Sequence, residues 1–220
     1  MERPKDISIS APVAIVIIVL FHLVGLAGFA VPSLRPLFVQ IVPWHLLLML
    51  VVITLSHKNI TSRFGLFVLL MFFLGFSAEW IGVHKGWLFG NYSYGSTLGY
   101  KLFVIPLMIG VNWFLLVYAA GVTMQRSRLK NTSFRILTGA IILLALDILI
   151  EPVAIKFDYW HWNNSIIPLK NYICWFLVSA AMLYVFELFS FKKQSIAAPV
   201  LLATEFVFFG VLNLIVLLLR

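Results

Sequence analysis

The sequence predicts an all-α, polytopic integral membrane protein with seven transmembrane helices, in a single domain that spans residues 1–220. Hydrophobic residues make up 62% of the chain, charged residues only 11%, and the mean hydropathy is +1.04. A water-soluble domain could not cover its surface with so few charges. The apolar residues also gather into seven stretches, and a helix that crosses the hydrocarbon core of a bilayer needs about 20 of them.

The first apolar stretch is expected to be a transmembrane helix and not a cleaved signal peptide. Arg3 and Lys5 precede it, as basic residues precede a signal sequence, but its apolar run from Ala11 to Val31 is long enough to span. No Ala-x-Ala cleavage site follows it. In chain order, we expect the seven helices at residues 11–31, 37–55, 64–81, 102–122, 134–155, 169–190 and 196–219.

Basic residues are distributed unequally between the two sets of loops. One set, taken with the N-terminal segment, contains ten, which are Arg3, Lys5, Lys58, Arg63, Arg126, Arg128, Lys130, Arg135, Lys192 and Lys193. The other side contains six, which are Arg35, Lys85, Lys101, Lys156, Lys170 and Arg220. Because cytoplasmic loops carry the excess of Lys and Arg, we expect a multi-pass protein of the cell membrane with its N-terminus inside and its C-terminus outside.

Composition and motif content argue against several functional classes. The net charge of +8 lies in loops and not on a soluble domain, so it does not indicate nucleic-acid binding. The single cysteine, Cys174, excludes an intrachain disulfide and a cysteine-rich metal site. The histidines lack metal-ligand spacing and no nucleotide-binding glycine motif occurs, so we expect no metal and no cofactor. A retinal protein would need a lysine in its last helix, and residues 196–219 contain none.

Three acidic residues stand out because they fall inside apolar stretches or at the end of one. Asp147 and Glu151 are four residues apart, so they share a helix face and lie about 6 Å apart along the axis. Glu79 approaches the same membrane level from the third predicted helix. A carboxylate in hydrocarbon costs roughly 2.5 kcal/mol or more, which favours an intramembrane site over accidental polarity.

We interpret these acids as general acid/base groups, with Asp147 and Glu151 as the pair and Glu79 supporting or replacing one of them. Two neighbouring carboxyl groups in a low dielectric are not expected to ionise together, and a neutral acid beside an ionised one suits proton transfer. The structural alternative is that the acids form ion pairs with loop lysines and only fasten the loops, the candidates being Lys85, Lys101 and Lys156.

Other polar residues in the apolar stretches are expected to serve helix packing, since hydrogen bonds between helices are the usual role of such residues. They are His22, His45, Asn112, Glu205 and Asn213. Among them Glu205 is the most unusual, because it lies well inside its helix. Glu187 lies near a helix end beside Lys192 and is expected to extend to the membrane interface.

Two loops that are rich in aromatic residues and glycine follow the acids, at residues 82–95 and 157–165. Both fall on the predicted external side. Trp and Tyr are enriched wherever a membrane meets water, which accounts for some of these rings. The position of Glu79 and Glu151 immediately before the two loops needs another explanation.

The two loops and their flanking helices carry sequence patterns of a known family. The first pattern is Glu79-Trp80-Ile81-Gly82-Val83, Gly86, Phe89-Gly90-x-Tyr92-x-Tyr94, Leu98-Gly99, Ile105-Pro106-Leu107 and Asn112-Trp113. The second is Asp147-x-x-x-Glu151-Pro152-Val153, Trp160-x-Trp162, Ile167-Pro168-Leu169-x-Asn171-Tyr172 and Trp175. Over roughly residues 70–190 the chain resembles the carotenoid biosynthesis protein family, whose members include carotenoid hydratases of the bacterioruberin and hydroxylated γ-carotene pathways.

The resemblance implies that the protein adds water across a terminal carbon–carbon double bond of a long polyene, without a cofactor. Protonation of a trisubstituted alkene gives a tertiary carbocation, which aromatic faces stabilise by about 2 kcal/mol when water is excluded. The residues expected to stabilise the cation, bind substrate or position water are Trp80, Tyr92, Tyr94, Asn112, Trp113, Trp160, Trp162, Asn171 and Trp175. An apolar groove between helices would hold the polyene, the lipid bilayer would be its route of entry, and other carotenoid-pathway enzymes are candidate partners.

Three other functions fit parts of the pattern. A lycopene-cyclase-like isomerase would begin with the same protonation, but another double bond would capture the cation. A proton-coupled membrane carrier would use the acids for coupling, although neither internal symmetry nor paired half-helices are evident. In a structural membrane protein the acids would only join helices.

Overall fold

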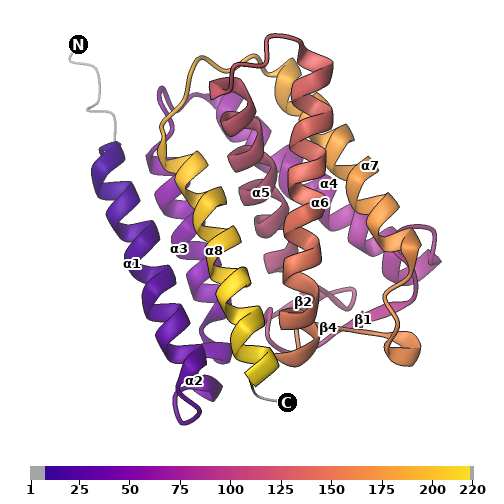
Figure 1. The fold of residues 1–220 in the computed structure, drawn as a ribbon. Helices are drawn as coiled ribbons and strands as arrows, with labels where there is room; N and C mark the ends of the chain where they lie inside the picture. Colours follow the sequence, from indigo (N-terminus) through magenta and orange to yellow (C-terminus); the bar gives the residue numbers. More distant parts are fainter. Residues whose placement is uncertain (1–7, 219–220) are drawn as a thin grey trace.

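The computed structural model describes residues 8–218 as a bundle of helices with short strands at one end (Figure 1). Six helices of the described chain are long and apolar enough to cross a membrane. They are α1 (Ala11–Ala30), α4 (Ser62–Lys85), α5 (Leu107–Arg126), α6 (Thr132–Lys156), α7 (Leu169–Leu188) and α8 (Ala197–Leu218). This architecture agrees with the predicted all-α membrane class.

The predicted helix at residues 37–55 is divided in two, which corrects the expectation of seven full-length helices. Its parts, α2 (Arg35–Gln40) and α3 (Val42–Leu55), are separated at Ile41, which has φ −91° and ψ 1°. Pro43 lies in the first turn of α3 and has no amide hydrogen to donate to a carbonyl of the preceding turn. The helical ladder therefore breaks, and the 14 residues of α3 are fewer than a full span needs.

The central element of the bundle is α5, which contacts α3, α4, α6, α7 and α8. Small residues allow these helices to approach closely, as is common in membrane bundles. A Cβ atom at Gly121 would lie 2.6 Å from the ring of Phe186 on α7, and one at Gly110 would lie 2.7 Å from the ring of Phe72 on α4. The close contacts around α5 thus depend on glycine at these two positions.

The start of α5 differs from the predicted boundary at residue 102. Residues 101–106 instead form a hairpin in which β2 (Lys101–Leu102) pairs with β3 (Ile105–Pro106). Phe103 and Val104 make the turn in the left-handed region, with φ of 51° and 61°. Pro106 precedes the first helical residue, and it restricts Ile105 to an extended backbone. The helix therefore begins at Leu107.

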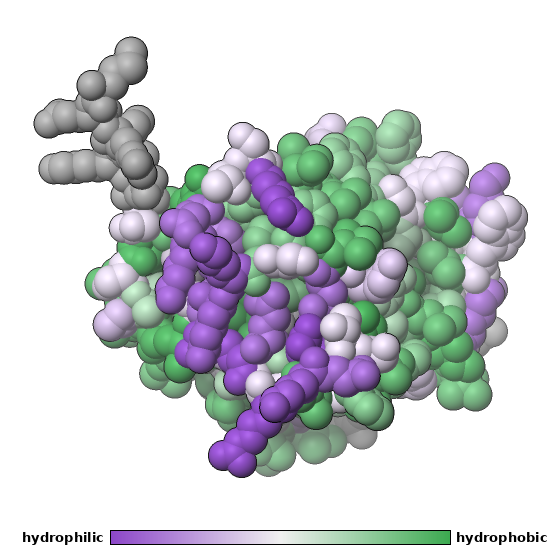
Figure 2. All heavy atoms as spheres, turned by 90° about the horizontal axis from the view of Figure 1, so that it is seen from above, coloured by the Kyte–Doolittle hydropathy of each residue, from purple (hydrophilic) through white to green (hydrophobic). Residues whose placement is uncertain are grey.

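The two ends of the bundle differ in charge. Figure 2 shows hydrophilic side chains gathered on the end that holds the α3–α4, α5–α6 and α7–α8 loops, with hydrophobic residues around them. The basic residues there are Lys58, Arg63, Arg126, Arg128, Lys130, Arg135, Lys192 and Lys193. The opposite end holds Arg35, Lys85, Lys101, Lys156 and Lys170. Arg3, Lys5 and Arg220, which were also counted from the sequence, lie outside the described residues.

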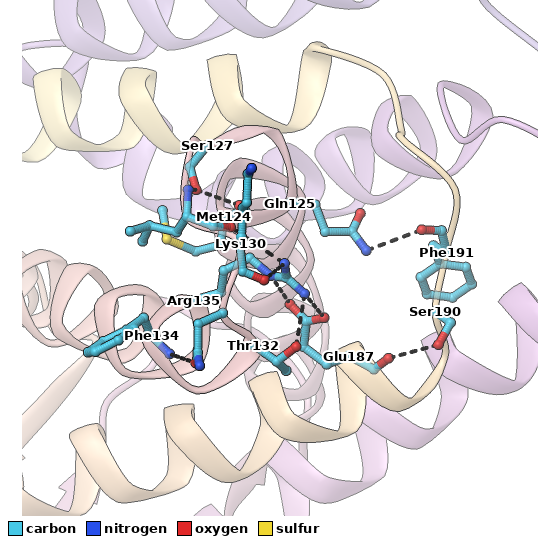
Figure 3. A network of polar contacts seen from close by, with 12 residues as sticks. Met124, Gln125, Ser127, Lys130, Thr132, Phe134, Arg135, Glu187, Ser190 and Phe191 are labelled. Carbon is cyan, nitrogen blue, oxygen red and sulfur yellow. Dashed lines mark hydrogen bonds and ion pairs between the residues drawn. The ribbon is translucent and has the colours of Figure 1, made fainter.

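A partly buried ion pair joins α6 to α7 at the more basic end (Figure 3). The Arg135 guanidinium donates through Nε to Glu187 Oε1 at 2.8 Å and through Nη2 to Glu187 Oε2 at 2.7 Å. The sequence placed Glu187 at the membrane interface beside Lys192, and the structure adds that Arg135 is its ionic partner. The bidentate geometry explains why Glu187 pairs with an arginine, because a planar guanidinium matches both oxygens of a carboxylate and an ammonium does not.

A buried histidine, which no sequence pattern singles out, packs between helices at the same end of the bundle. His57, between α3 and α4, is buried, and its Nδ1 lies 2.7 Å from the Tyr118 hydroxyl. Its ring stacks on Phe64 with a centroid distance of 3.6 Å. Burial lowers the pKa of His57 to about 4, so the imidazole is neutral near pH 7.

This burial predicts a pH-dependent stability. Between pH 6.5, the ordinary histidine pKa, and about 4 the unfolded chain binds a proton that the folded His57 does not. The contribution to stability is therefore complete above pH 6.5 and falls as the pH is lowered toward 4. The melting temperature of the purified protein in detergent, measured at intervals from pH 7 to 4, should fall more steeply for the wild type than for His57→Gln. Parallel curves for the two proteins would contradict the prediction.

Candidate active site

The two aromatic loops pair with each other across one end of the bundle. Strand β1 (Tyr92–Tyr94) runs antiparallel to β4 (Trp160–Trp162), in a register that places Tyr92 opposite Trp162 and Tyr94 opposite Trp160. The central pair, Ser93 and His161, is exposed. Since side chains alternate along a strand, the four aromatic residues share the face that is turned toward the helices. The two predicted loops therefore form one structure, which we call the aromatic ribbon (residues 92–94 and 160–162).

Backbone contacts beside the aromatic ribbon require a glycine and an aspartate. A Cβ atom at Gly95 would lie 2.1 Å from the carbonyl oxygen of Asp158, so only glycine fits there. Asp158 accepts hydrogen bonds from the Ser96 hydroxyl at 2.6 Å and the Ser96 amide at 2.7 Å. These bonds, with His161 Nε2 at 2.6 Å, lower the pKa of Asp158 to about 2. The ionised aspartate thus ties the two strands together at neutral pH.

Glu79, on α4, is buried under the tyrosines of the aromatic ribbon. Its Oε2 accepts hydrogen bonds from the Tyr92 hydroxyl at 2.5 Å and the Tyr94 hydroxyl at 2.7 Å. Its Oε1 accepts a bond from Trp113 Nε1, on α5, at 3.0 Å. Burial, and next the negative charge of Glu79, raise the pKa of both tyrosines well above 10, so both phenols remain donors at neutral pH.

Glu151, on α6, is buried under the tryptophans of the same ribbon. Its Oε2 accepts hydrogen bonds from Trp162 Nε1 at 2.8 Å and from Trp160 Nε1 at 3.1 Å. Its Oε1 accepts a bond from Asn171 Nδ2, on α7, at 3.2 Å. Each of the two glutamates thus receives two bonds on one oxygen from the ribbon and one bond on the other oxygen from a helix.

Asp147 lies one turn before Glu151 and is linked to it through Asn171. The Asn171 amide donates to Asp147 Oδ2 at 3.1 Å as well as to Glu151. Asp147 is completely buried, and its Oδ1 has no hydrogen-bond partner within residues 8–218. The predicted face shared by Asp147 and Glu151 exists, but the bridge between the two carboxyl groups is an amide.

A small cavity separates the two glutamates. Its volume is about 30 Å³, and Glu79, Glu151, Asn112 and Asn171 line it together with aromatic and aliphatic side chains. The other lining residues are Phe89, Tyr92, Tyr94, Ile109, Ile150, Trp160, Trp162 and Trp175. A water molecule needs roughly 10–15 Å³ and two or more polar partners, so the cavity is large enough and polar enough to hold one.

The small cavity adjoins a much larger groove. The groove has a volume of about 350 Å³ and is lined mainly by apolar residues of α1, α3, α5 and α8. Ile109, Asn112, Ile150 and Trp160 line both spaces, so they form the boundary between them. No residue of the described chain is recorded as a hydrogen-bond partner of the Asn112 side chain, which leaves its amide free at this boundary. A long apolar molecule in the groove could thus place one end against the two glutamates.

The structure brings most of the predicted site residues together, with three exceptions. Asp147 and Trp113 line neither space, although both are hydrogen-bonded within the cluster. Trp113 also stacks on Trp175, with a centroid distance of 4.5 Å. Trp80 lines neither space, and its ring stacks on His84 one turn along α4, so it lies apart from the other predicted substrate-binding residues.

Lysines do not neutralise the three acids in the described part of the chain, contrary to the alternative considered from the sequence. Ion pairs there involve Glu205, Glu187 and Asp158 only. Lys101 donates to the backbone carbonyl of Tyr94 at 2.7 Å. Neutral N–H and O–H donors of the aromatic ribbon, α5 and α7 take the place of lysine around Glu79 and Glu151.

Sequence reasoning did not find all of the residues around these spaces. Ile109 precedes Asn112 by one helical turn, and Ile150 is next to Glu151, so both could have been placed by helical periodicity. His22, His45 and Glu205 were assigned to helix packing, but all three line the groove. They come from three helices that are far apart in sequence, so no local pattern could have joined them.

Comparison with known proteins identifies the family. The sequence model of the carotenoid biosynthesis protein family matches residues 36–219. The chain belongs to the carotenoid biosynthesis protein family. The matched region contains Glu79, Asp147 and Glu151 and the whole aromatic ribbon.

One relative with an assigned activity shares modest sequence identity with this chain. The chain is 25% identical over 144 residues to the bisanhydrobacterioruberin hydratase of Haloarcula japonica. The match covers 62% of this chain and 49% of that protein, so the chain spans about half the length of the curated relative. No solved structure gives a significant match to this carotenoid biosynthesis protein family member.

The geometry predicts that a single phenol contributes measurably to stability. In Tyr94→Phe, Glu79 loses one of two hydrogen bonds on Oε2, and we expect the free energy of unfolding to fall by about 1–3 kcal/mol. Chemical denaturation of the purified protein in detergent measures this change. Tyr100→Phe is the matched control, because Tyr100 is 75% exposed. Equal stabilities of the two variants would contradict the assignment of Tyr94 to the buried cluster.

Proposed function

We propose that this family member is a carotenoid hydratase, which adds water across a terminal carbon–carbon double bond of a polyene. The observation that carries the proposal is the small cavity lined by Glu79 and Glu151, which adjoins the apolar groove at Asn112. The family assignment and the name of the Haloarcula japonica relative support the same chemistry. The reaction class would be that of a hydro-lyase that uses no cofactor.

The polyene tail would occupy the groove, and its terminal double bond would reach the boundary at Ile109, Asn112, Ile150 and Trp160. The groove walls are predominantly apolar, so they offer few hydrogen bonds to replace those that a polar substrate would lose with water. They therefore favour a hydrocarbon chain. The substrate would enter from the bilayer, since α1 and α8, which wall the groove, carry many exposed hydrophobic residues.

Two glutamates on opposite sides of the cavity can divide the proton transfers between them. One carboxyl group donates its proton to the less substituted alkene carbon, so a C–H bond forms and the π bond breaks. The positive charge then lies on the tertiary carbon, facing the ring of Trp160. The oxygen of water bonds to that carbon, and the other glutamate, as a carboxylate, accepts the proton that the water loses. The sum of these steps is the addition of one water molecule, and transfer of a proton from the second glutamate back to the first would restore the starting state.

Asp147 and Asn171 would position the reacting glutamate. The Asn171 amide has two hydrogens, and its nitrogen is placed between Asp147 Oδ2 and Glu151 Oε1. An amide held in this way keeps Oε1 of Glu151 directed toward the cavity, while the tryptophans occupy Oε2. Asp147 would therefore act on the reaction through Asn171, and not by contact with substrate.

The space for water distinguishes hydration from cyclisation. A cyclase that captures the cation with a second double bond would be expected to exclude water from the cation. Here the small cavity is lined by two carboxyl groups and two amides, which can orient a water molecule beside the reacting carbon. The same argument favours a reaction over a carrier function, since the carboxyl groups share the cavity with amides that can orient water beside an apolar groove.

The proposal includes a membrane topology. The chain would cross the cell membrane seven times, with α2 and α3 together serving as the second crossing. The start of α1 and the end of α8 lie at opposite ends of the bundle (Figure 1). The end opposite the aromatic ribbon carries more of the basic residues, so it would face the cytoplasm, and the ribbon and the C-terminus would lie outside.

Expression in a host engineered to accumulate lycopene tests the function. We expect the extracted pigment to gain the mass of one or two water molecules, with oxygen from labelled water. Glu79→Gln and Glu151→Gln should each lower product by 100-fold or more, on the order of what loss of an acid or base costs. Trp80→Phe is the control, because Trp80 lies away from the cavity and should retain activity.

Other products would lead to other conclusions. An isomer of unchanged mass would identify a cyclase-like enzyme. Unchanged pigment with lycopene, with γ-carotene and with a longer polyene, from a protein that is present and folded in the membrane, would refute the hydratase proposal. Activity that survives in both glutamine variants would remove the glutamates from the mechanism.

A positioning role for Asp147 predicts a selective kinetic effect. Asp147→Asn preserves the size of the side chain but disturbs its bond to the Asn171 amide, so kcat should fall by about tenfold to a hundredfold while KM changes little. The pH profile of kcat should also change, because the substitution removes an ionisable group next to Glu151. A purely structural role would instead reduce the amount of folded enzyme and leave kcat and its pH profile unaltered.

A further inference from the structure

The apolar groove opens on the side of the bundle, between α1 and α3. Four of the side chains that line it are more than a third exposed, and all four belong to α1, to α3 or to the residue that precedes α3. They are Phe21, Val24, Ile41 and Trp44. The lining residues from α5, α6 and α8 are buried or half-buried. The groove therefore meets the surface along the line between α1 and α3, on the side of the bundle away from α7 (Figure 1).

Two ring contacts bound this opening along the helix axis. The rings of His22 and His45 meet edge to face with centroids 4.6 Å apart. Closer to the aromatic ribbon, the ring centroids of Phe29 and Phe38 lie 6.5 Å apart. His22 and Phe29 are seven residues apart, so about 10 Å of α1 lies between the two contacts. We call this opening the portal, with one edge at residues 22–29 and the other at residues 38–45.

Close packing limits the groove on two other sides. α1 packs against α8, and a Cβ atom at Gly25 would lie 3.1 Å from the ring of Phe208. Near the aromatic ribbon, a Cβ atom at Gly99 would lie 3.0 Å from the ring of Pro43, and the neighbouring Leu98 is buried. The loop after β1 thus covers that end of the groove, and the portal is the side that meets lipid.

A carotenoid is longer than the groove. The groove follows α1 from Phe21 to Phe29, which is about 12 Å of helix. An extended carotenoid is about as long as the hydrocarbon core of a bilayer is thick, roughly 30 Å. A molecule whose end reaches Asn112 therefore extends beyond the groove. The portal leads this remaining length into the hydrocarbon of the bilayer, where an apolar chain is soluble.

We propose that the polyene crosses from the bilayer into the groove through the portal and stays threaded there while one of its ends reacts. The inference rests on the proposed function and specifies how its substrate binds. One terminal double bond lies beside the two glutamates, the middle of the chain passes between α1 and α3, and the far end remains in lipid. Trp44, which is 70% exposed, lies at the outer edge of the portal and contacts the chain where it leaves the protein.

Variants that fill the portal test the threading without any turnover. Lycopene is achiral, so circular dichroism in its absorption band reports binding to the chiral groove. In the full chain in nanodiscs, Val24→Trp and Ile41→Trp, on opposite edges of the portal, should each weaken lycopene binding by about tenfold or more, because an added indole takes the space of the chain. Leu23→Trp is the matched control and should bind as the wild type does, since Leu23 is exposed on α1 but does not line the groove.

A short probe separates a filled portal from a damaged protein. Myrcene is a hydrocarbon that ends in the same kind of trisubstituted double bond, but it is about a quarter as long as lycopene and can lie within the groove. Its affinity is measured by the lycopene signal that it displaces. In Val24→Trp and Ile41→Trp this affinity should change by about threefold or less, because a short ligand does not pass through the portal.

The outcomes for the portal and for the reaction are distinct. Equal lycopene affinity in Leu23→Trp and in both portal variants would overturn the proposal, as would equal losses of affinity for lycopene and for myrcene. A wild type that gives no induced signal with lycopene, γ-carotene or a longer polyene would overturn it too. Hydration of lycopene that is undiminished in both portal variants would remove the portal and leave the hydratase function in place. Lycopene binding that the portal variants weaken, without hydration of any polyene, would do the reverse.

Discussion

The need to hydrogen-bond two carboxyl groups inside an apolar bundle governs the arrangement of this end of the molecule. A carboxylate that leaves water loses several kcal/mol of hydration, and only close partners compensate for that loss. Glu79 and Glu151 have no lysine or arginine as a partner in the described chain, so six bonds from neutral donors replace a counter-charge. Four of these six donors belong to the aromatic ribbon, which therefore cannot be a passive interfacial belt.

The aromatic ribbon achieves this through the period of a β-strand. Tyr92 and Tyr94 are two residues apart, as are Trp160 and Trp162, so both pairs project from one face when the strands pair. The antiparallel register then directs the tyrosines to one glutamate and the tryptophans to the other. A change of register that turned Ser93 and His161 inward would leave each carboxyl group with only its donor from a helix. The pairing of two short loops thus depends on the acids as much as the acids depend on it.

Much of this organisation is visible in the sequence. The apolar stretches locate the helices, and the spacing of Asp147 and Glu151 places them on one helix face. The proximity of Glu79 and Glu151 to two aromatic loops also indicates that loops and acids belong together. The break at Pro43 and the late start of α5 after Pro106 carry local signals, but average hydropathy hides them, because proline interrupts a helix without making the segment polar.

The sequence by itself therefore determined the membrane class, the positions of most of the long helices, and most of the acids and rings that lie together beneath the aromatic ribbon. Only the tertiary structure decided which donor serves which carboxyl group, that an amide links Asp147 to Glu151, and that His22, His45 and Glu205 meet in one groove. The reason is physical. Helical and strand periodicities fix which residues share a face within one element, whereas the register between strands and the packing of distant helices depend on contacts between residues far apart in the chain.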